Sequence, residues 1–161
     1  MAQGRQHHYE ITVRWDCTEG TTLDYRSYSR EHVIEVAGKA ALRGSADTAY
    51  RGDANLHNPE DLLVASLSAC HMLWVLHLCA DNGVEVLHYE DKAMGTMLDG
   101  PGPGRFTEVI LRPRVTISAN SDEAAALAQH ERAHRECFIA NSVNFPVRHE
   151  PVIVRAGEDV D

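Results

Sequence analysis

The chain has 161 residues, of which 43% are hydrophobic and 24% charged, so it holds enough apolar material for one globular domain of ordinary size. Its formal net charge is −9, from 24 acidic and 15 basic side chains. Because an acidic chain repels nucleic acid and anionic membrane surfaces, we expect neither as a partner.

The N-terminal part of the chain predicts two strands and a long loop. Residues 8–15 alternate apolar and polar side chains, which is typical of a strand, and residues 32–38 predict a second strand that ends at Gly38. The segment between them is rich in turn-forming residues and favours a hairpin. Residues 44–60 are polar and small, and they predict a loop that leads into the next element.

The clearest predicted element is a long helix over about residues 59–81. Asn58 is a good N-cap, Pro59 suits the first helical position, and Gly83 suits the position just after the end. No glycine or proline interrupts the run from Leu62 to Cys79. Because apolar residues surround this helix on nearly all sides, we expect it to be central and buried.

The second half of the chain predicts further strands and a second helix. That helix begins after a cap at Asn120 or Ser121, and Cys137 either closes it or opens the short turn that follows. Pro113 favours an edge position or a bulge in its strand. The predicted order is β-β-α-β-β-α-β in a single α+β domain over residues 1–161, with frayed ends at 1–7 and 155–161. The predicted strands of this half cover residues 84–98, 105–118 and 145–155, and the predicted helix covers residues 119–137.

The four cysteines are candidates for chemistry, but their spacing forms neither a CxxC pair nor a zinc-finger pattern. Each one taken alone is more simply interpreted as a small buried hydrophobe. The N-terminus has no apolar signal-peptide segment, and serine and histidine interrupt the apolar stretch at residues 62–80, which argues against a membrane span. We expect a cytoplasmic protein, where disulfides are usually catalytic or transient.

Cys70 lies in the middle of the apolar helix, where a thiol is ordinarily protonated and inert. For Cys70 to react, a loop must bring a cation to it, because the helix N-terminus is two to three turns away. Arg51 precedes Glu60 by nine residues, and a two-pronged pair between them would hold a guanidinium near the thiol. The alternative, an ordinary surface ion pair between these two residues, stays open.

Two segments carry a resemblance to a known family. The sequence NPEDLLVASLSACH is followed some sixty residues later by AHRECFIANSV. Together they resemble the OsmC/Ohr family of hydroperoxide-reducing proteins, in which an NPE-type helix start precedes one cysteine and a second cysteine lies at a helix junction. The resemblance extends from about Tyr9 to Val154.

The resemblance implies both a fold and a site. The fold would be an OsmC-like intertwined α+β homodimer, with two long central helices packed against sheets and active sites at the subunit interface. Carried over to this sequence, Cys70 would be the attacking thiol and Cys137 the resolving thiol. Glu60 would be the site carboxylate and Arg51 the site arginine, with Arg30 as the alternative arginine.

The implied function is that of a thiol-dependent peroxidase in oxidative-stress defence. It would reduce organic hydroperoxides through a Cys70 sulfenic acid and a Cys70–Cys137 disulfide. No bound cofactor is expected, because an external dithiol or a lipoylated protein would supply the electrons.

Two other interpretations remain. His130, His134 and Cys137 lie at i, i+4 and i+7 on one helix face, and with His71 or Cys70 they would supply four ligands for a metal ion such as zinc. The chain would otherwise be a non-enzymatic dimeric stress protein with inert cysteines.

Overall fold

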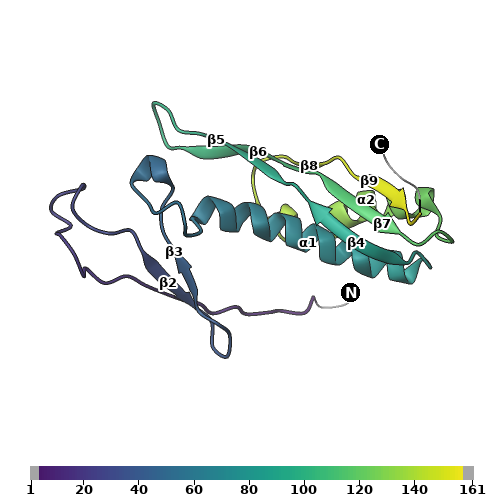
Figure 1. The fold of residues 1–161 in the computed structure, drawn as a ribbon, viewed down its shortest axis with the longest axis horizontal. Helices are drawn as coiled ribbons and strands as arrows, with labels where there is room; N and C mark the ends of the chain where they lie inside the picture. The colour runs from purple at the N-terminus through teal and green to yellow at the C-terminus, as the bar shows by residue number, and fades with distance from the viewer. Residues whose placement is uncertain (1–3, 158–161) are drawn as a thin grey trace. The chain divides into compact units, whose positions relative to one another are not determined.

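The computed structural model describes residues 4–157, and the chain divides into two compact units, Met1–Leu62 and Leu63–Asp161. Groups of strands lie before, between and after the two α-helices along the chain, as Figure 1 shows. The α+β class predicted from the sequence is confirmed.

The N-terminal unit contains a small antiparallel sheet in the order β1-β2-β3. Its strands are β1 (Thr12–Arg14), β2 (His32–Glu35) and β3 (Leu42–Gly44), and a 3₁₀ turn, η1 (Thr48–Tyr50), follows them. The first two strands were predicted, although both are shorter than expected. The third was not predicted, because three residues are too few to show a strand alternation.

Helix α1 (Pro59–Asp81) has the predicted bounds and the predicted caps. The Asn58 side-chain oxygen accepts a hydrogen bond from the backbone N–H of Asp61 at 2.7 Å, and Asp61 accepts one from the backbone N–H of Asn58 at 3.3 Å. These two bonds form a reciprocal capping box, which satisfies N–H groups that a helix start leaves free. Gly83 ends the helix with a φ of +69°, a conformation that glycine adopts without strain.

The C-terminal unit contains two three-stranded sheets, in the orders β4-β7-β9 and β5-β6-β8. Pairs β4–β7 and β5–β6 are antiparallel, whereas β6–β8 and β7–β9 are parallel. Each of the three strands predicted here is therefore present but divided in two. The observed strands are β4 (Val86–Asp91), β5 (Met94–Leu98), β6 (Arg105–Leu111), β7 (Pro113–Ile117), β8 (Val147–His149) and β9 (Val152–Arg155).

The breaks between β4 and β5, between β6 and β7, and between β8 and β9 lie beside one another, and hydrogen bonds of Asp91 hold this region together. One of its carboxylate oxygens accepts the backbone N–H of Arg112 at 2.7 Å, and the other accepts the Ser68 hydroxyl of α1 at 2.5 Å. Pro113 is buried at the start of the central strand β7 rather than at an edge, which corrects the prediction. A first strand residue can be proline, because its missing N–H falls at the break.

The last strand also corrects the expected frayed tail. Arg155 is the final residue of β9 and pairs with Ile117, and the backbone N–H of Ala156 donates to the Ile117 carbonyl at 2.8 Å. Residues 1–3 and 158–161 of the predicted frayed ends lie outside the described residues.

Helix α2 (Glu123–Glu136) is capped by Asp122, not by Asn120 or Ser121 as predicted. The Asp122 carboxylate accepts the backbone N–H of Ala125 at 2.7 Å, and a charged oxygen is also favoured at the positive end of the helix dipole. Cys137 is the C-cap residue, as predicted, and a 3₁₀ turn, η2 (Ala140–Ser142), follows it.

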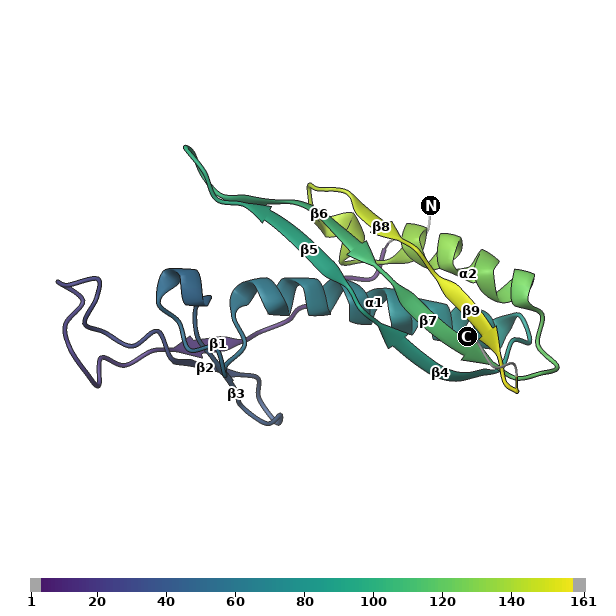
Figure 2. The same cartoon turned by 45° about the horizontal axis from the view of Figure 1, so that its top comes forward.

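The hydrophobic core belongs to the C-terminal unit, where both helices lie on the same side of the strands (Figures 1 and 2). One cluster joins α1, β7 and α2, and a second joins α1, β6 and β8. The buried members of the first are Val75, Leu78, Cys79, Val84, Val115, Ile117, Ala126 and Ala133, and those of the second are Leu67, Val109, Leu111 and Val147.

Within one chain, helix α1 is not buried on all sides, so its expected burial on nearly all sides stays a prediction for the homodimer that the resemblance implies. Its buried residues are few, and Leu73 has 62% of its surface exposed. By length and composition α1 is apolar enough to cross a membrane, with a hydropathy of 1.8, but a core helix passes the same test. The buried face packs against sheet and helix, as a core helix does, and consists of Leu67, His71, Val75, Leu78 and Cys79.

Candidate active site

The structure brings Cys70 and Cys137 together in the C-terminal unit. Cys70 comes from the middle of α1 and Cys137 from the C-cap of α2, and the Cys70 side chain lies close enough to Cys137 to raise the pKa of its thiol. Cys137 is buried, while Cys70 is partly exposed, and both are free thiols. Two thiols in contact, one of them open to solvent, can exchange between a dithiol and a disulfide.

The environment of Cys137 favours its protonated form. Burial raises the pKa of the Cys137 thiol to about 11, and the neighbouring Cys70 side chain acts in the same direction. The backbone N–H of Ala140, 3.4 Å from the sulfur, opposes them. Cys137 is therefore a thiol at neutral pH, so Cys70 is the member of the pair that is left to act as nucleophile.

An aromatic pair borders the two thiols. Trp74 lies one helical turn after Cys70, Phe138 follows Cys137 directly, and their ring centroids are 5.6 Å apart in an edge-to-face arrangement. Phe138 has 71% of its surface exposed. The solvent-facing border of the thiol pair is therefore apolar.

The other two cysteines have different surroundings. Cys79 is buried in the core, where burial raises the pKa of its thiol. Cys17 is exposed in the N-terminal unit. Neither thiol is paired with another cysteine.

Arg51 and Glu60 belong to the N-terminal unit, and Glu60 also opens α1. Arg51 is exposed and has a φ of +67°, an uncommon conformation for a residue other than glycine. Gly52 follows it, and a Cβ there would lie 1.6 Å from the Ala46 carbonyl oxygen, so only glycine fits. Among the residues that the structure describes, one carboxylate oxygen of Glu60 is buried without a hydrogen-bond partner.

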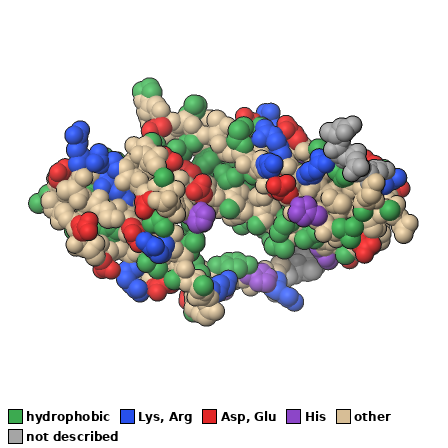
Figure 3. All heavy atoms as spheres, in the orientation of Figure 1, with side chains coloured by type: hydrophobic (Ala, Val, Ile, Leu, Met, Phe, Trp, Pro, Cys, Tyr) green, Lys and Arg blue, Asp and Glu red, His purple; other side chains and the backbone are tan. Residues whose placement is uncertain are grey.

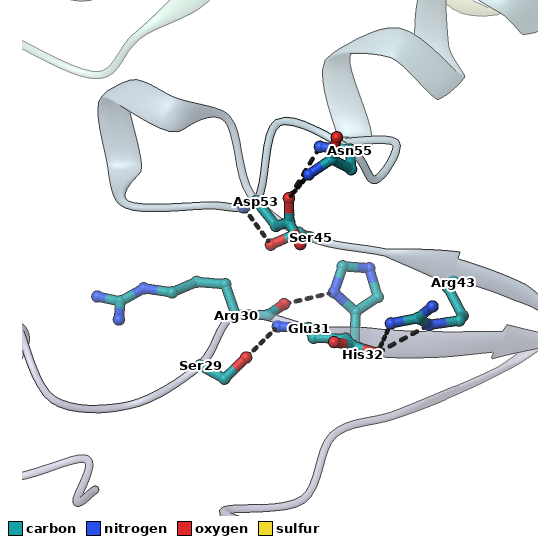
Figure 4. Close-up of polar contacts among 8 residues, drawn as sticks. All are labelled: Ser29, Arg30, Glu31, His32, Arg43, Ser45, Asp53 and Asn55. Carbon is teal, nitrogen blue, oxygen red and sulfur yellow. Dashed lines mark hydrogen bonds and ion pairs between the residues drawn. The ribbon is translucent and has the colours of Figure 1, made fainter. Parts of the chain in front are cut away.

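Arg30, the alternative arginine, is held by contacts within the N-terminal unit. Its guanidinium lies over the ring of Tyr28 at 3.9 Å and that of Tyr25 at 4.6 Å, and it donates to both backbone carbonyls. In Figure 4 its side chain extends away from His32, whose ring N–H donates to the Arg30 carbonyl at 2.9 Å. Arg30 also lines a mostly apolar cavity of about 470 Å³, together with Val13, Trp15, Thr22, Tyr28, His32, Ser45, Ala46 and Pro59.

A cluster of histidines next to the thiol pair was not predicted as a unit. His71 of α1 and His130 of α2 are both 1% exposed, and their ring nitrogens are joined by a hydrogen bond of 3.1 Å. The ring of His149 in β8 makes tilted contacts with that of His71, at a centroid distance of 5.4 Å, and with that of His134, at 5.2 Å. The signal in the sequence was the i, i+4 spacing of His130 and His134, which was interpreted as a set of metal ligands.

The metal site considered from the sequence does not form within residues 4–157. His130 is hydrogen-bonded to His71, His134 lies in a tilted ring contact with His149, and Cys137 neighbours Cys70, so the three side chains have three different partners. In this part of the chain, no group of three His, Cys, Asp or Glu side chains is arranged to hold a metal ion.

Comparisons with known proteins define the family. The family model described as OsmC-like protein matches residues 52–151. The structure also matches that of an OsmC-like protein of unknown function from Vibrio cholerae, with 32% identity, a TM-score of 0.84, and coverage of 91% of this chain and 100% of that one. The chain belongs to the OsmC-like protein family.

More distant solved structures share the fold. An organic hydroperoxide resistance protein from Legionella pneumophila has a TM-score of 0.62 and 17% identity, over 92% of this chain and 98% of that one. One from Bacillus subtilis has a TM-score of 0.60 and 17% identity, over 91% and 98%. No curated protein matches the sequence.

Proposed function

We propose that the protein is a thiol-dependent peroxidase that reduces organic hydroperoxides. The observation that carries the proposal is the contact between Cys70, which is partly exposed, and Cys137, which is buried and protonated. Two structures that share the fold are named organic hydroperoxide resistance proteins, which supports the same reaction class. The apolar border formed by Trp74 and Phe138 favours an organic over an inorganic peroxide.

The proposed peroxidase reaction has three steps. The Cys70 thiolate attacks the outer oxygen of ROOH, the O–O bond breaks, and ROH leaves after taking a proton, with Cys70 as a sulfenic acid. The Cys137 thiol then attacks this sulfur, which forms the disulfide and releases water. An external dithiol, free or on a lipoylated protein, returns two electrons and two protons and becomes a disulfide itself.

The thiolate of Cys70 requires a cation, and we assign this role to Arg51, oriented by Glu60. Along α1, ten residues separate Glu60 from Cys70, a rise of about 15 Å, so the carboxylate acts through the arginine rather than on the sulfur. The unpartnered carboxylate oxygen of Glu60 is free to accept a guanidinium N–H. Arg30 is the alternative, although its donors already serve two carbonyl groups.

We also propose that the protein acts as a homodimer in the cytoplasm. The N-terminal unit exposes several large apolar side chains, and a second copy is a partner that could cover them. With a net charge of −9, nucleic acid is not an expected partner. These side chains and their exposed fractions are Tyr9 89%, Ile11 64%, Val13 58%, Leu23 96% and Tyr25 53%.

Peroxide consumption and mass spectrometry test the reaction. We expect cumene hydroperoxide to be consumed faster than hydrogen peroxide, with a Cys70–Cys137 disulfide as the product. Cys70→Ser should abolish turnover, Cys137→Ser should allow one turnover and leave a sulfenic acid, and Cys17→Ser is the matched control. Unreactive thiols in the wild type would instead favour a non-enzymatic stress protein, and a disulfide from Cys70 to Cys17 or Cys79 would reject Cys137.

The two arginines are separated by substitution. Arg51→Ala should slow peroxide attack about a hundredfold, or roughly 3 kcal/mol in the barrier, because the cation that stabilises the thiolate is lost. Arg51→Lys should restore little, since ammonium lacks the fork that binds Glu60. Stopped-flow measurements of the rate of peroxide attack decide between the two arginines. If Arg30→Ala loses activity and Arg51→Ala keeps it, Arg30 is the arginine that stabilises the Cys70 thiolate.

A further inference from the structure

Helices α1 and α2 meet at two polar contacts, one between thiols and one between imidazoles. Cys70 and His71 are consecutive on α1, and their partners on α2, Cys137 and His130, are seven residues apart on one face. Seven helical residues span about 10 Å. The hydrogen bond between His71 Nε2 and His130 Nδ1, at 3.1 Å, is therefore a second fixed point between the two helices.

The bond between the two rings requires at least one of them to be neutral, because one nitrogen must donate and the other accept. Burial lowers the pKa of His71 to about 3 and that of His130 to about 4, and neighbouring histidines act in the same direction. Both rings are therefore neutral at pH 7.

Other titratable groups face the pair. From β8, the His149 ring makes a tilted contact with His71, and from α2, the His134 ring makes a tilted contact with His149. Glu131 of α2 lies 3.2 Å from the His149 ring nitrogen. From β4, Tyr89 stacks on His130 with ring centroids 6.5 Å apart.

We infer that His71 and His130 are positioning residues: their hydrogen bond fixes α1 against α2 so that Cys70 and Cys137 stay within disulfide-forming distance. The inference rests on the proposed function only in taking these two cysteines as the redox pair. The bond would set the equilibrium between dithiol and disulfide, which is a property separate from peroxide turnover.

The physical reason is that the two kinds of contact tolerate displacement differently. Apolar contacts between helices are not directional, so α1 can shift against them at modest cost. A buried hydrogen bond is directional, and a shift that breaks it leaves two buried polar nitrogens unpaired, at about 1–3 kcal/mol each. A disulfide in turn requires Cβ atoms roughly 3.5–4.5 Å apart, so a small shift decides whether it forms without strain.

Equilibration with glutathione tests the inference without any peroxide. In this reaction the protein dithiol and oxidised glutathione give the protein disulfide and two reduced glutathione molecules, with two electrons and two protons transferred. His71→Phe and His130→Phe keep a ring at each position and remove the bond. We expect each to lower the equilibrium constant for disulfide formation about tenfold, or about 30 mV.

Three further variants separate positioning from stability. His71→Gln places an amide near the position of Nε2 and should stay within about twofold of the wild type. The double variant His71→Phe/His130→Phe leaves no unpaired nitrogen, so it should regain stability in urea unfolding while its equilibrium constant stays tenfold low. His88→Phe, exposed on β4, is the matched control and should match the wild type.

Two results would overturn the inference. One is an equilibrium constant of the double variant that returns to the wild-type value together with its stability, since the pair would then act on stability alone. The other is an equilibrium constant of His71→Gln as low as that of the double variant. These two variants decide the question even if the single phenylalanine variants do not fold. A protein that shows the expected pattern but consumes no peroxide would keep this inference and reject the proposed function.

Discussion

The two units of the chain differ in how they are stabilised. Within residues 4–157, every buried apolar side chain belongs to the C-terminal unit, where two helices cover two sheets. Among the described residues 4–62 of the N-terminal unit, only Gly44 and Ser45 are buried, and neither has a large side chain. Figure 3 shows hydrophobic side chains exposed on the viewed face, between charged ones.

The difference shows which unit can hold a precise site. The thiol pair and the histidine pair both lie between α1 and α2, where close packing fixes side chains. A three-stranded sheet without a core needs further contacts for stability. The thiol pair therefore lies within the packed C-terminal unit, whereas the N-terminal unit exposes an apolar surface.

The largest effect should come from the core of the C-terminal unit. Leu67 has none of its surface exposed, and Leu67→Ala should lower the free energy of unfolding by about 2–5 kcal/mol, because it leaves a cavity. Leu23 is 96% exposed, and Leu23→Ala should change it by less than about 0.5 kcal/mol. Urea unfolding at one protein concentration compares the two; equal losses would mean that Leu23 is buried in the assembled protein.

Acid should act on the C-terminal unit through its two buried histidines. Below the ordinary histidine pKa of about 6.5, the unfolded chain takes up protons, whereas the folded rings stay neutral down to a pKa of about 4 for His130 and about 3 for His71. The unfolded state then binds more protons than the folded state, so the free energy of unfolding decreases as the pH is lowered.

We expect the free energy of unfolding to fall by about 3 kcal/mol between pH 6.5 and 5, roughly half of it from each ring, in a range where most carboxylates are still ionised. Urea unfolding at several pH values measures it. In His71→Gln the slope should be shallower, because the amide does not titrate. A slope identical to that of the wild type would show that His71 is charged in the folded protein.

The smallest effect should come from the apolar surface of the N-terminal unit. Ile11 is 64% exposed, so Ile11→Asp should leave the fold of one chain intact. In a homodimer that covers this surface, the Ile11→Asp substitution would bury a charge. It would raise the dissociation constant of the dimer at least tenfold, or about 1.4 kcal/mol in the free energy of association. Sedimentation over a range of concentrations tests this, and a monomeric wild type near 17.9 kDa would reject the dimer.

The sequence predicted best the elements whose signals are local. The bounds of α1 followed from Asn58 before it and Gly83 after it, both of which act within one turn. The divided strands were not predicted, because the break depends on Asp91, which accepts an N–H twenty-one residues later in the chain. The cap of α2 was misplaced by one or two positions, since Asn120, Ser121 and Asp122 are all suitable cap residues.

For the site, the sequence indicated residue types but not their partners. The roles of Cys70 and Cys137 came from the family resemblance, because their contact depends on how α1 packs against α2. His130 and His134 were correctly placed on one helix face. Their partners, His71 and His149, lie 59 residues before His130 and 15 residues after His134, so no local pattern could join them into the observed cluster.

The parallel pairing of β8 with β6 and of β9 with β7 has a consequence for how the chain is made. Both sheets of the C-terminal unit are completed by β8 and β9, which are synthesised after α2. Until then β6 and β7 each present an open edge, and such long-range pairings form slowly. A nascent chain that stalls before residue 147 therefore exposes two unpaired strand edges beside an apolar helix, and would depend on chaperones to stay soluble.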